Sequence, residues 1–225
     1  MTLSATELAS MIDISAVRTD SSDIKVAEAV ACARQFGCYL VTILPAQTLL
    51  AKELLGELET PKLGGNVGFP SGGHTTSIKS LETRELVKMG VDEIDMVVNM
   101  PALISGRIGD VYTDIAAIVE AAEGHPVKTI FECHYLNDDQ IRAGCDQAIR
   151  AGAAFVKTGT GWAPSGATIE NITLIKRHVG EAIKIKASGG VPGIDTISAM
   201  YALGVSRFGI STQNVTRIFN MIQQL

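Results

Sequence analysis

Short apolar runs alternate with longer amphipathic stretches along the whole of this 225-residue chain. The apolar runs are rich in β-branched side chains, which is typical of strands that are buried on both faces. Strands of that kind belong to parallel sheets, so the pattern predicts a parallel sheet. The runs cover residues 11–15, 39–44, 63–69, 93–99, 127–133, 154–159, 183–188 and 206–211.

The stretches between these runs have the spacing of apolar residues that is typical of amphipathic helices. Several of them end in glycine, as helices do when the following residue takes a left-handed conformation. These glycines are Gly37, Gly90, Gly152 and Gly204. The predicted helices cover residues 22–37, 75–90, 109–124, 136–152, 168–180 and 193–204.

Eight strand-plus-helix units of about 28 residues each favour an α/β fold, the (β/α)₈ TIM barrel, as a single domain over residues 1–225. A doubly wound open sheet is the main competitor. Such a sheet often carries a glycine-rich fingerprint after its first strand, and the stretch MIDISAVRTD contains no glycine. We therefore expect the barrel.

The composition is that of an ordinary soluble globular protein, with 46% hydrophobic and 19% charged residues. Nineteen basic against 24 acidic residues give a net charge of −5, and no basic run is present. This balance argues against nucleic acid as a partner. No apolar run is long enough to cross a bilayer, so we expect no membrane partner.

The first residues lack the basic and apolar regions of a signal peptide. The four cysteines form no CxxC pair in a chain of this size, which favours free thiols in a reducing compartment. They are Cys32, Cys38, Cys133 and Cys145. We therefore expect a cytoplasmic protein.

The barrel prediction says where chemistry belongs, because the functional side chains of such barrels lie at the carboxyl ends of the strands. The predicted strand ends carry more polar side chains than an apolar barrel interior requires. They are Asp13, Ser15, Thr42, Asn66, Asp95, Asn99, Glu132, Lys157 and Lys186, followed by the glycine–hydroxyl pair Gly209 and Ser211.

Lys157 and Lys186 end the sixth and seventh predicted strands, which are neighbours in a barrel. Burial lowers the pKa of a lysine, and a second ammonium nearby lowers it further, so that the free amine can attack a carbonyl group. A snorkelling surface lysine is the alternative explanation for each of them. Asp95 would balance charge or relay a proton, whereas Glu132 favours a structural role, holding a lysine or an amide network.

Glycine-rich stretches follow the last two strands, where barrels commonly bind phosphate through backbone N–H groups. Residues 158–161 follow strand six and supply a possible third wall. The predicted substrate- and phosphate-binding residues in these stretches are Thr158, Gly159, Ser188, Gly189, Gly190, Gly209, Ser211 and Thr212.

Three segments, DEIDMVVN, FVKTGTGWAPSGAT and IKASGG, resemble the active-site segments of the deoxyribose-phosphate aldolases. VGFPSGGHTTSIKSLET resembles that family's loop after strand three, and GVSRFGIST resembles its closing phosphate loop. The resemblance runs from about residue 10 to residue 215. The strand-six lysine followed by Thr-x-Thr-Gly is its most diagnostic part.

The resemblance implies a class I aldolase on a (β/α)₈ barrel. Such an enzyme reversibly cleaves 2-deoxy-D-ribose 5-phosphate to acetaldehyde and D-glyceraldehyde 3-phosphate. Lys157 would form the Schiff base, Lys186 would lower its pKa, and Asp95 would shuttle a proton through an ordered water. Asp13 and Ser15 would correspond to the polar residues of the family's first strand. The chemistry implies no metal and no cofactor.

The chain departs from the family pattern at three places. Pro192-Gly193 stands where Arg-Thr is common, Gly209 is followed by Ile-Ser-Thr-Gln, and strand one reads IDIS in place of Asp-His-Thr. The first two departures fall on the expected phosphate end, so they bear on the substrate more than on the lysine chemistry.

Three alternatives stay open. The first is a paralogous Schiff-base aldolase that acts on a different phosphorylated sugar. The second is a metal-dependent aldolase or epimerase that uses Glu132 and His134 with Cys133 or His74. The third is a sugar-phosphate sensor without catalysis. A homodimer or homotetramer is possible, and Trp162 after strand six is expected to be a lid or packing residue.

Overall fold

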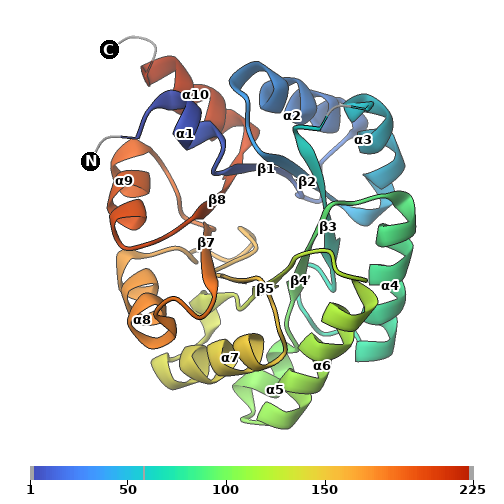
Figure 1. Ribbon diagram of the computed structural model, residues 1–225, viewed down its shortest axis with the longest axis vertical. Helices are drawn as coiled ribbons and strands as arrows, with labels where there is room; N and C mark the ends of the chain where they lie inside the picture. Colours follow the sequence, from blue (N-terminus) through green and yellow to red (C-terminus); the bar gives the residue numbers. More distant parts are fainter. Residues whose placement is uncertain (1–2, 58, 223–225) are drawn as a thin grey trace.

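The computed structural model describes residues 3–57 and 59–222, and within them eight parallel strands close into a barrel in sequence order. Figure 1 shows the barrel with the helices arranged around it. The predicted (β/α)₈ fold is therefore confirmed. The strands are β1 (Ile12–Ala16), β2 (Leu40–Ile43), β3 (Lys62–Val67), β4 (Glu93–Val97), β5 (Val127–Ile130), β6 (Phe155–Lys157), β7 (Lys184–Ser188) and β8 (Arg207–Ser211).

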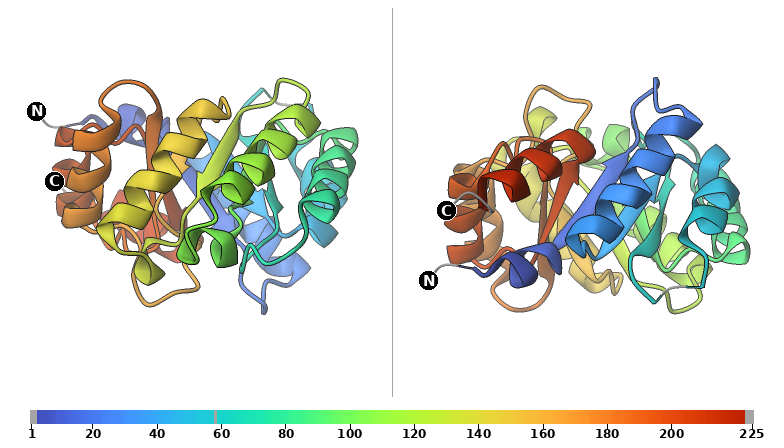
Figure 2. Two further views of the ribbon diagram at one scale, coloured as in Figure 1. Left: turned by 90° about the horizontal axis from the view of Figure 1, so that it is seen from below. Right: turned by 90° about the horizontal axis from the view of Figure 1, so that it is seen from above.

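All six predicted helices are present, and they pack along the outside of the strands (Figure 2). They are α2 (Asp23–Phe36), α4 (Thr76–Met89), α6 (Ile108–Ala121), α7 (Asp138–Arg150), α8 (Ile169–Val179) and α9 (Ile194–Ala202). The pattern did not identify the shorter α1 (Ala5–Ala9), α3 (Thr48–Leu55) and α5 (Met100–Ile104), nor α10 (Thr212–Ile222). In the described part of the chain, no helix is long and apolar enough to span a membrane.

All four predicted glycine stops have left-handed φ values, and Gly152 (φ 79°) and Gly204 (φ 95°) each follow the C-cap residue of their helix. Gly37 ends α2 with φ 71°, and Gly90 ends α4 with φ 85°. α10 begins directly after β8, at Thr212, and it packs on α2 through stacked rings of Phe219 and Phe36 whose centroids are 4.8 Å apart. This contact places the last helix beside the first strand, where β1 pairs with β8 and closes the barrel.

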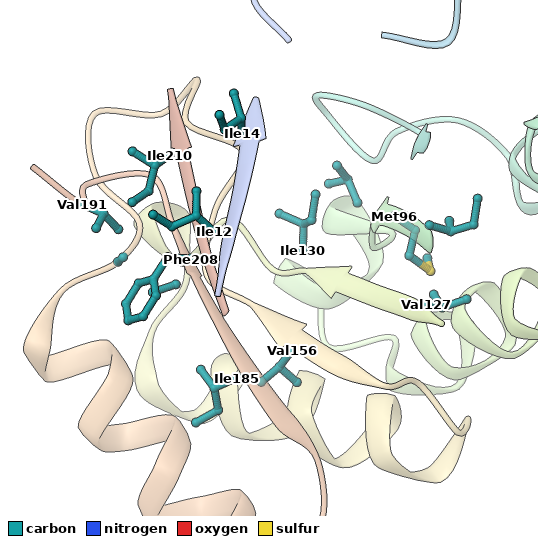
Figure 3. Packing of buried hydrophobic residues seen from close by; sticks show 14 of the residues in the cluster. Ile12, Ile14, Met96, Val127, Ile130, Val156, Ile185, Val191, Phe208 and Ile210 are labelled. Atoms are coloured by element: carbon teal, nitrogen blue, oxygen red, sulfur yellow. The ribbon is translucent and has the colours of Figure 1, made fainter. Parts of the chain in front are cut away.

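Successive side chains of a strand point to opposite faces, and here the two faces differ in polarity. Ile12 and Ile14 of β1 belong to the buried apolar layer, together with Phe208 and Ile210 of the neighbouring β8 (Figure 3). The residue between the two isoleucines, Asp13, instead contacts charged side chains inside the barrel. The apolar layer therefore lies between sheet and helices, and the barrel interior is left for polar groups.

A buried ion pair joins α4 to α6 outside the barrel. Lys79 Nζ lies 2.8 Å from Asp114 Oδ2 and donates to the carbonyl of Val97 at 2.9 Å. Thr76 Oγ1 donates to the other carboxylate oxygen of Asp114 at 3.0 Å. Both charged side chains are fully buried, so each depends on the other for its compensation.

The Lys79→Met variant leaves Asp114 buried without a cation, so we expect a loss of about 3–5 kcal/mol in the free energy of unfolding. Urea denaturation measures this loss. The double variant Lys79→Met, Asp114→Leu removes both charges and should recover most of the stability. A single variant as stable as the parent would contradict this account of the pair.

Candidate active site

Lys157 and Lys186 lie side by side inside the barrel. Lys157 is the last residue of β6, Lys186 is central in β7, and the register of the two strands pairs them directly. Both ammonium groups contact the same oxygen of Asp95, Oδ2, at 2.6 Å and 2.8 Å. The side chains predicted to act together are therefore close neighbours, and Lys157 is only 4% exposed.

The Lys157 amine has a depressed pKa. Burial is the largest cause, because it disfavours the charged form. Asp95 opposes this effect, Lys186 adds to it, and together they lower the pKa of Lys157 to about 8. About a tenth of these amines are therefore neutral at pH 7, compared with well under a thousandth for an ordinary lysine.

Asp95 is charged throughout this pH range. Burial alone would raise its pKa, but Lys128, Lys157 and Lys186 together hold the pKa of Asp95 well below its usual value. Its second oxygen, Oδ1, lies 2.8 Å from Lys128 Nζ. Both oxygens of Asp95 are thus engaged by ammonium groups, which fixes the orientation of the carboxylate.

Lys128 of β5 is a buried lysine that was not predicted to belong to the site. Besides Asp95, its Nζ contacts Glu93 Oε2 at 2.6 Å and Asp13 Oδ2 at 3.5 Å. Burial opposes its charge, but these three carboxylates raise the pKa of Lys128 above its ordinary value. Lys128 therefore stays cationic and supports Asp95 from the side away from Lys157.

Arg207 of β8 links the remaining acids. Its Nη1 lies 2.8 Å from Asp13 Oδ1 and 3.5 Å from Glu93 Oε2, and its guanidinium stacks 3.8 Å from the ring centroid of Tyr39. The other oxygen of Asp13 lies 2.5 Å from Lys186 Nζ. Asp13, predicted as a substrate-binding residue, is thus fully buried among charged partners in this structure.

We call the charged side chains that meet inside the barrel the barrel cluster. It has one more basic than acidic member, so full ionisation would leave a buried excess of positive charge. Lys157, the member at the end of its strand, relieves that excess when it loses a proton. The cluster consists of Asp13, Glu93, Asp95, Lys128, Lys157, Lys186 and Arg207.

Glu132 holds the loop after β6. It accepts hydrogen bonds from the backbone N–H and the hydroxyl of Thr160, as expected for a carboxylate that orders an amide network. His134, its partner in the metal hypothesis, instead bonds Ser165 Oγ through Nδ1 at 2.8 Å. Over the described residues, no three His, Cys, Asp or Glu side chains converge as a ligand set.

A cavity of about 300 Å³, which we call the rim cavity, lies where the ends of β1, β7 and β8 meet the loop after β6. Six predicted binding residues line it: Ser15, Ser188, Gly189, Gly190, Gly209 and Ser211. The other wall residues are Val17, Arg18, Thr160, Gly161, Ala163, Pro164, Val191, Ile210 and Asn214.

Besides Asp13 of the barrel cluster, three predicted binding residues lie outside the lining of the rim cavity. Thr158 is buried and donates to the carbonyl of Ser188 at 2.7 Å, so it joins β6 to β7. Gly159 packs between Glu132 and that same carbonyl. Thr212 lines a larger neighbouring cavity between the β1–α2 segment and α10.

Glycine is required at the floor of the rim cavity. A Cβ on Gly209 would lie 2.7 Å from Ser188 Oγ, closer than real Cβ contacts allow. Gly189 and Gly190 have φ values of 77° and 118°, which side chains rarely adopt. The backbone is therefore free of side chains on this wall, as an anion site built from N–H groups requires.

The whole chain was also compared with known proteins. The model of the family described as "DeoC/LacD family aldolase" matches residues 7–202. The chain belongs to the DeoC/LacD aldolase family. It is accordingly an aldolase, an enzyme that makes and breaks carbon–carbon bonds.

Several curated relatives of this DeoC/LacD aldolase are named deoxyribose-phosphate aldolase. The one from Klebsiella pneumoniae subsp. pneumoniae is 41% identical over 96% of this chain and 88% of its own length. The one from Rhizobium meliloti is 44% identical over 94% of this chain and 85% of its own length.

Solved structures agree with the family assignment. A putative deoxyribose-phosphate aldolase from Coccidioides immitis superposes with a TM-score of 0.92 at 30% identity, covering 99% of this chain and 88% of that one. The aldolase from Aeropyrum pernix, described as a unique tetrameric structure, has a TM-score of 0.86 at 25% identity and covers 98% and 92%.

A signal in the sequence could have found the missed members of the barrel cluster. Asp95 was recognised because it stands near the end of its strand, but Glu93 stands two residues earlier and faces the same side. Lys128 and Arg207 are likewise charged residues within apolar runs. Reading alternate strand positions, rather than strand ends alone, would have identified all three.

In the DeoC/LacD aldolase described here, we expect Lys157 to titrate near pH 8 and Lys186→Met to raise the pKa of Lys157. The pKa of Lys157 should rise because the Lys186 ammonium, which disfavours the charged form of Lys157, is removed. Trace acetic anhydride labelling over a pH series, read by mass spectrometry, gives the pKa of each lysine. Lys184→Met, at an exposed position of the same strand, is the control and should leave Lys157 unchanged. An unmoved pKa in Lys186→Met would contradict the electrostatic account.

Proposed function

We propose that this aldolase reversibly cleaves 2-deoxy-D-ribose 5-phosphate to acetaldehyde and D-glyceraldehyde 3-phosphate through a Schiff base on Lys157. The observation that carries the proposal is the buried Lys157 amine, with a pKa of about 8, in contact with Asp95 and next to Lys186. A lysine in this state is nucleophilic near neutral pH.

The first step is attack of the neutral Lys157 Nζ on the C1 aldehyde of the open-chain sugar. Loss of water gives an iminium ion. The C2–C3 bond then breaks, its electron pair moves into the iminium to form an enamine, and the C3 hydroxyl gives up its proton. D-Glyceraldehyde 3-phosphate leaves, the enamine takes a proton at C2, and water releases acetaldehyde. The iminium nitrogen is the electron sink, so the scheme requires no metal and no cofactor.

The barrel cluster suits these charge changes. The iminium carries the same positive charge as the protonated amine, so Asp95 stabilises it through the contact that it already makes with Lys157. Asp95 remains a carboxylate, and we assign to it the relay of protons through an ordered water. The charge of Lys186 adds to the lowering of the Lys157 pKa that burial causes, while Lys128 holds Asp95 in place.

We assign the rim cavity to the phosphate of the substrate. Its walls carry glycine backbone at Gly189, Gly190 and Gly209 and hydroxyl groups at Ser188 and Ser211. Such groups bind phosphate oxygens by donating hydrogen bonds. Ser188 follows Lys186 by two residues on β7, so the cavity lies directly beyond the lysines along the strand.

A DeoC/LacD aldolase that acts on another phosphorylated sugar is the second candidate, because Pro192-Gly193 alters the stretch that follows Gly190. The metal-dependent alternative predicts loss of activity in EDTA, whereas the Schiff-base mechanism predicts none.

We also propose a cytoplasmic homo-oligomer, since all four cysteines are free and one structural neighbour is described as tetrameric. Light scattering tests the oligomeric state.

Incubation with acetaldehyde and borohydride should add one ethyl group to Lys157, because borohydride reduces the iminium to a stable secondary amine. Peptide mass spectrometry locates the adduct. The adduct should be absent from Lys157→Ala, present in the Lys184→Met control, and insensitive to EDTA. An adduct that persists in Lys157→Ala, or that maps to Lys186, would refute the assignment.

The value of kcat/KM should be at least about 100-fold higher for 2-deoxyribose 5-phosphate than for free 2-deoxyribose, because two or more charge-assisted hydrogen bonds are lost with the phosphate. Steady-state kinetics with both sugars tests this. Gly209→Ala places a Cβ against Ser188 and should reduce the ratio, whereas Gly193→Ala, whose Cβ meets nothing within 4 Å, should not. Equal kcat/KM values for the two sugars would show that the enzyme does not recognise the phosphate, and would contradict that part of the proposal.

A further inference from the structure

The charge of the rim cavity comes from one side chain. Among the residues that line it, none is acidic and Arg18 is the one that carries a charge. The stretch after β7 reads Gly189-Gly190-Val191-Pro192-Gly193 and contributes no cation. A phosphate dianion in this cavity would therefore meet its counter-charge on the β1–α2 loop.

Arg18 is held at the rim by the loop after β6. Its Nη1 donates to the carbonyl of Gly161 at 3.0 Å, and its guanidinium carbon lies 5.1 Å from the ring centroid of Trp162. Trp162 in turn donates from Nε1 to the carbonyl of Val17 at 3.0 Å, and its ring meets Phe69 edge-on with centroids 6.0 Å apart. These contacts preorganise the guanidinium over the cavity.

Most hydrogen-bond donors of Arg18 remain available. A guanidinium has five N–H donors, and in the described part of the chain the Arg18 side chain makes one hydrogen bond and no ion pair. The nearest acid in sequence, Asp20, lies 2.6 Å from Lys25 Nζ. The planar Arg18 guanidinium has free donors and lies at the edge of a cavity whose lining contains no acidic residue. Its geometry matches that of a phosphate group.

The other nearby cations are placed differently. Lys157 and Lys186 are engaged by Asp95 inside the barrel. Lys25 and Arg18 both line the larger neighbouring cavity, but only Arg18 of the two also lines the rim cavity. Arg217 of α10 donates to the carbonyl of Pro192 and does not line the rim cavity.

We propose that Arg18 is the specificity-determining residue of this aldolase, which binds the phosphate of the substrate in the rim cavity while Trp162 and Gly161 hold its guanidinium in position. The proposal rests on the proposed function for the identity of the sugar. It adds a residue from the β1–α2 loop to a site otherwise built from glycines and hydroxyl groups.

Steady-state kinetics of Arg18→Gln test the proposal. We expect kcat/KM for 2-deoxyribose 5-phosphate to fall about 10- to 100-fold, mainly through KM, and kcat/KM for free 2-deoxyribose to stay unchanged. Arg18→Lys should recover only part of the loss, because an ammonium lacks the planar fork. Lys25→Gln is the matched control: it removes one charge on the same side of the molecule and should change neither sugar's kcat/KM.

A binding measurement separates this proposal from the proposed function. Trp162 is the one tryptophan of the chain and stacks on Arg18, so its fluorescence should report inorganic phosphate. At constant ionic strength, phosphate should bind the parent and Lys25→Gln equally, and Arg18→Gln about 10-fold or more weakly. Circular dichroism confirms that the variants are folded.

Each outcome decides between the two proposals. Arg18-dependent phosphate binding in a protein that turns over neither sugar would overturn the proposed substrate and leave the role of Arg18 standing. Turnover of the phosphorylated sugar with unchanged KM in Arg18→Gln would overturn the role of Arg18 and leave the proposed function standing. Equal losses for both sugars would also overturn it, because Arg18 would then act on the fold and not on the phosphate.

Discussion

The carboxylate of Asp95 is the interaction on which the interior of the barrel depends. One of its oxygens is shared by Lys157 and Lys186, and the other is bonded to Lys128. Without this anion the three ammonium groups would repel one another in a space closed to water. With it, the three groups share the interior of the barrel: Asp13 and Glu93 balance the further charges of Lys186 and Lys128, and the pKa of Lys157 is lowered to about 8.

The fold contains two kinds of buried lysine, one with a structural role and one with a proposed role in catalysis. Lys79 has one carboxylate partner, and this pair joins two helices outside the barrel. Lys157 shares its carboxylate with two other cations and lies at the end of its strand beside the rim of the barrel. Burial lowers the pKa of both lysines, and a carboxylate opposes this effect in each case. Only Lys157 also has other ammonium groups beside it, which lower its pKa further. The stoichiometry of charge therefore distinguishes the reactive lysine from the structural one.

The two ends of the proposed substrate would meet two different environments. The aldehyde would reach the buried charges of the barrel cluster, and the phosphate would reach the glycine backbone of the rim cavity, which Arg18 also lines. Trp162 connects the loops after β1 and β6 over this region. Glu132 also fixes the loop after β6, because it accepts a hydrogen bond from the backbone of Thr160. Trp162 and Glu132, which take no part in the proposed reaction, therefore hold the loop that contacts Arg18.

The sequence alone determined the strand and helix alternation, and with it the barrel, because buried strands and amphipathic helices leave different periodic patterns. It also determined Lys157, Lys186 and Asp95 as a group, because parallel strands align their ends. Only the tertiary structure showed which charges Lys128, Glu93 and Arg207 contact, since the partners of an inward charge belong to strands far apart in sequence. It alone placed Arg18 at the rim cavity, because a loop residue has no periodicity that predicts the direction of its side chain.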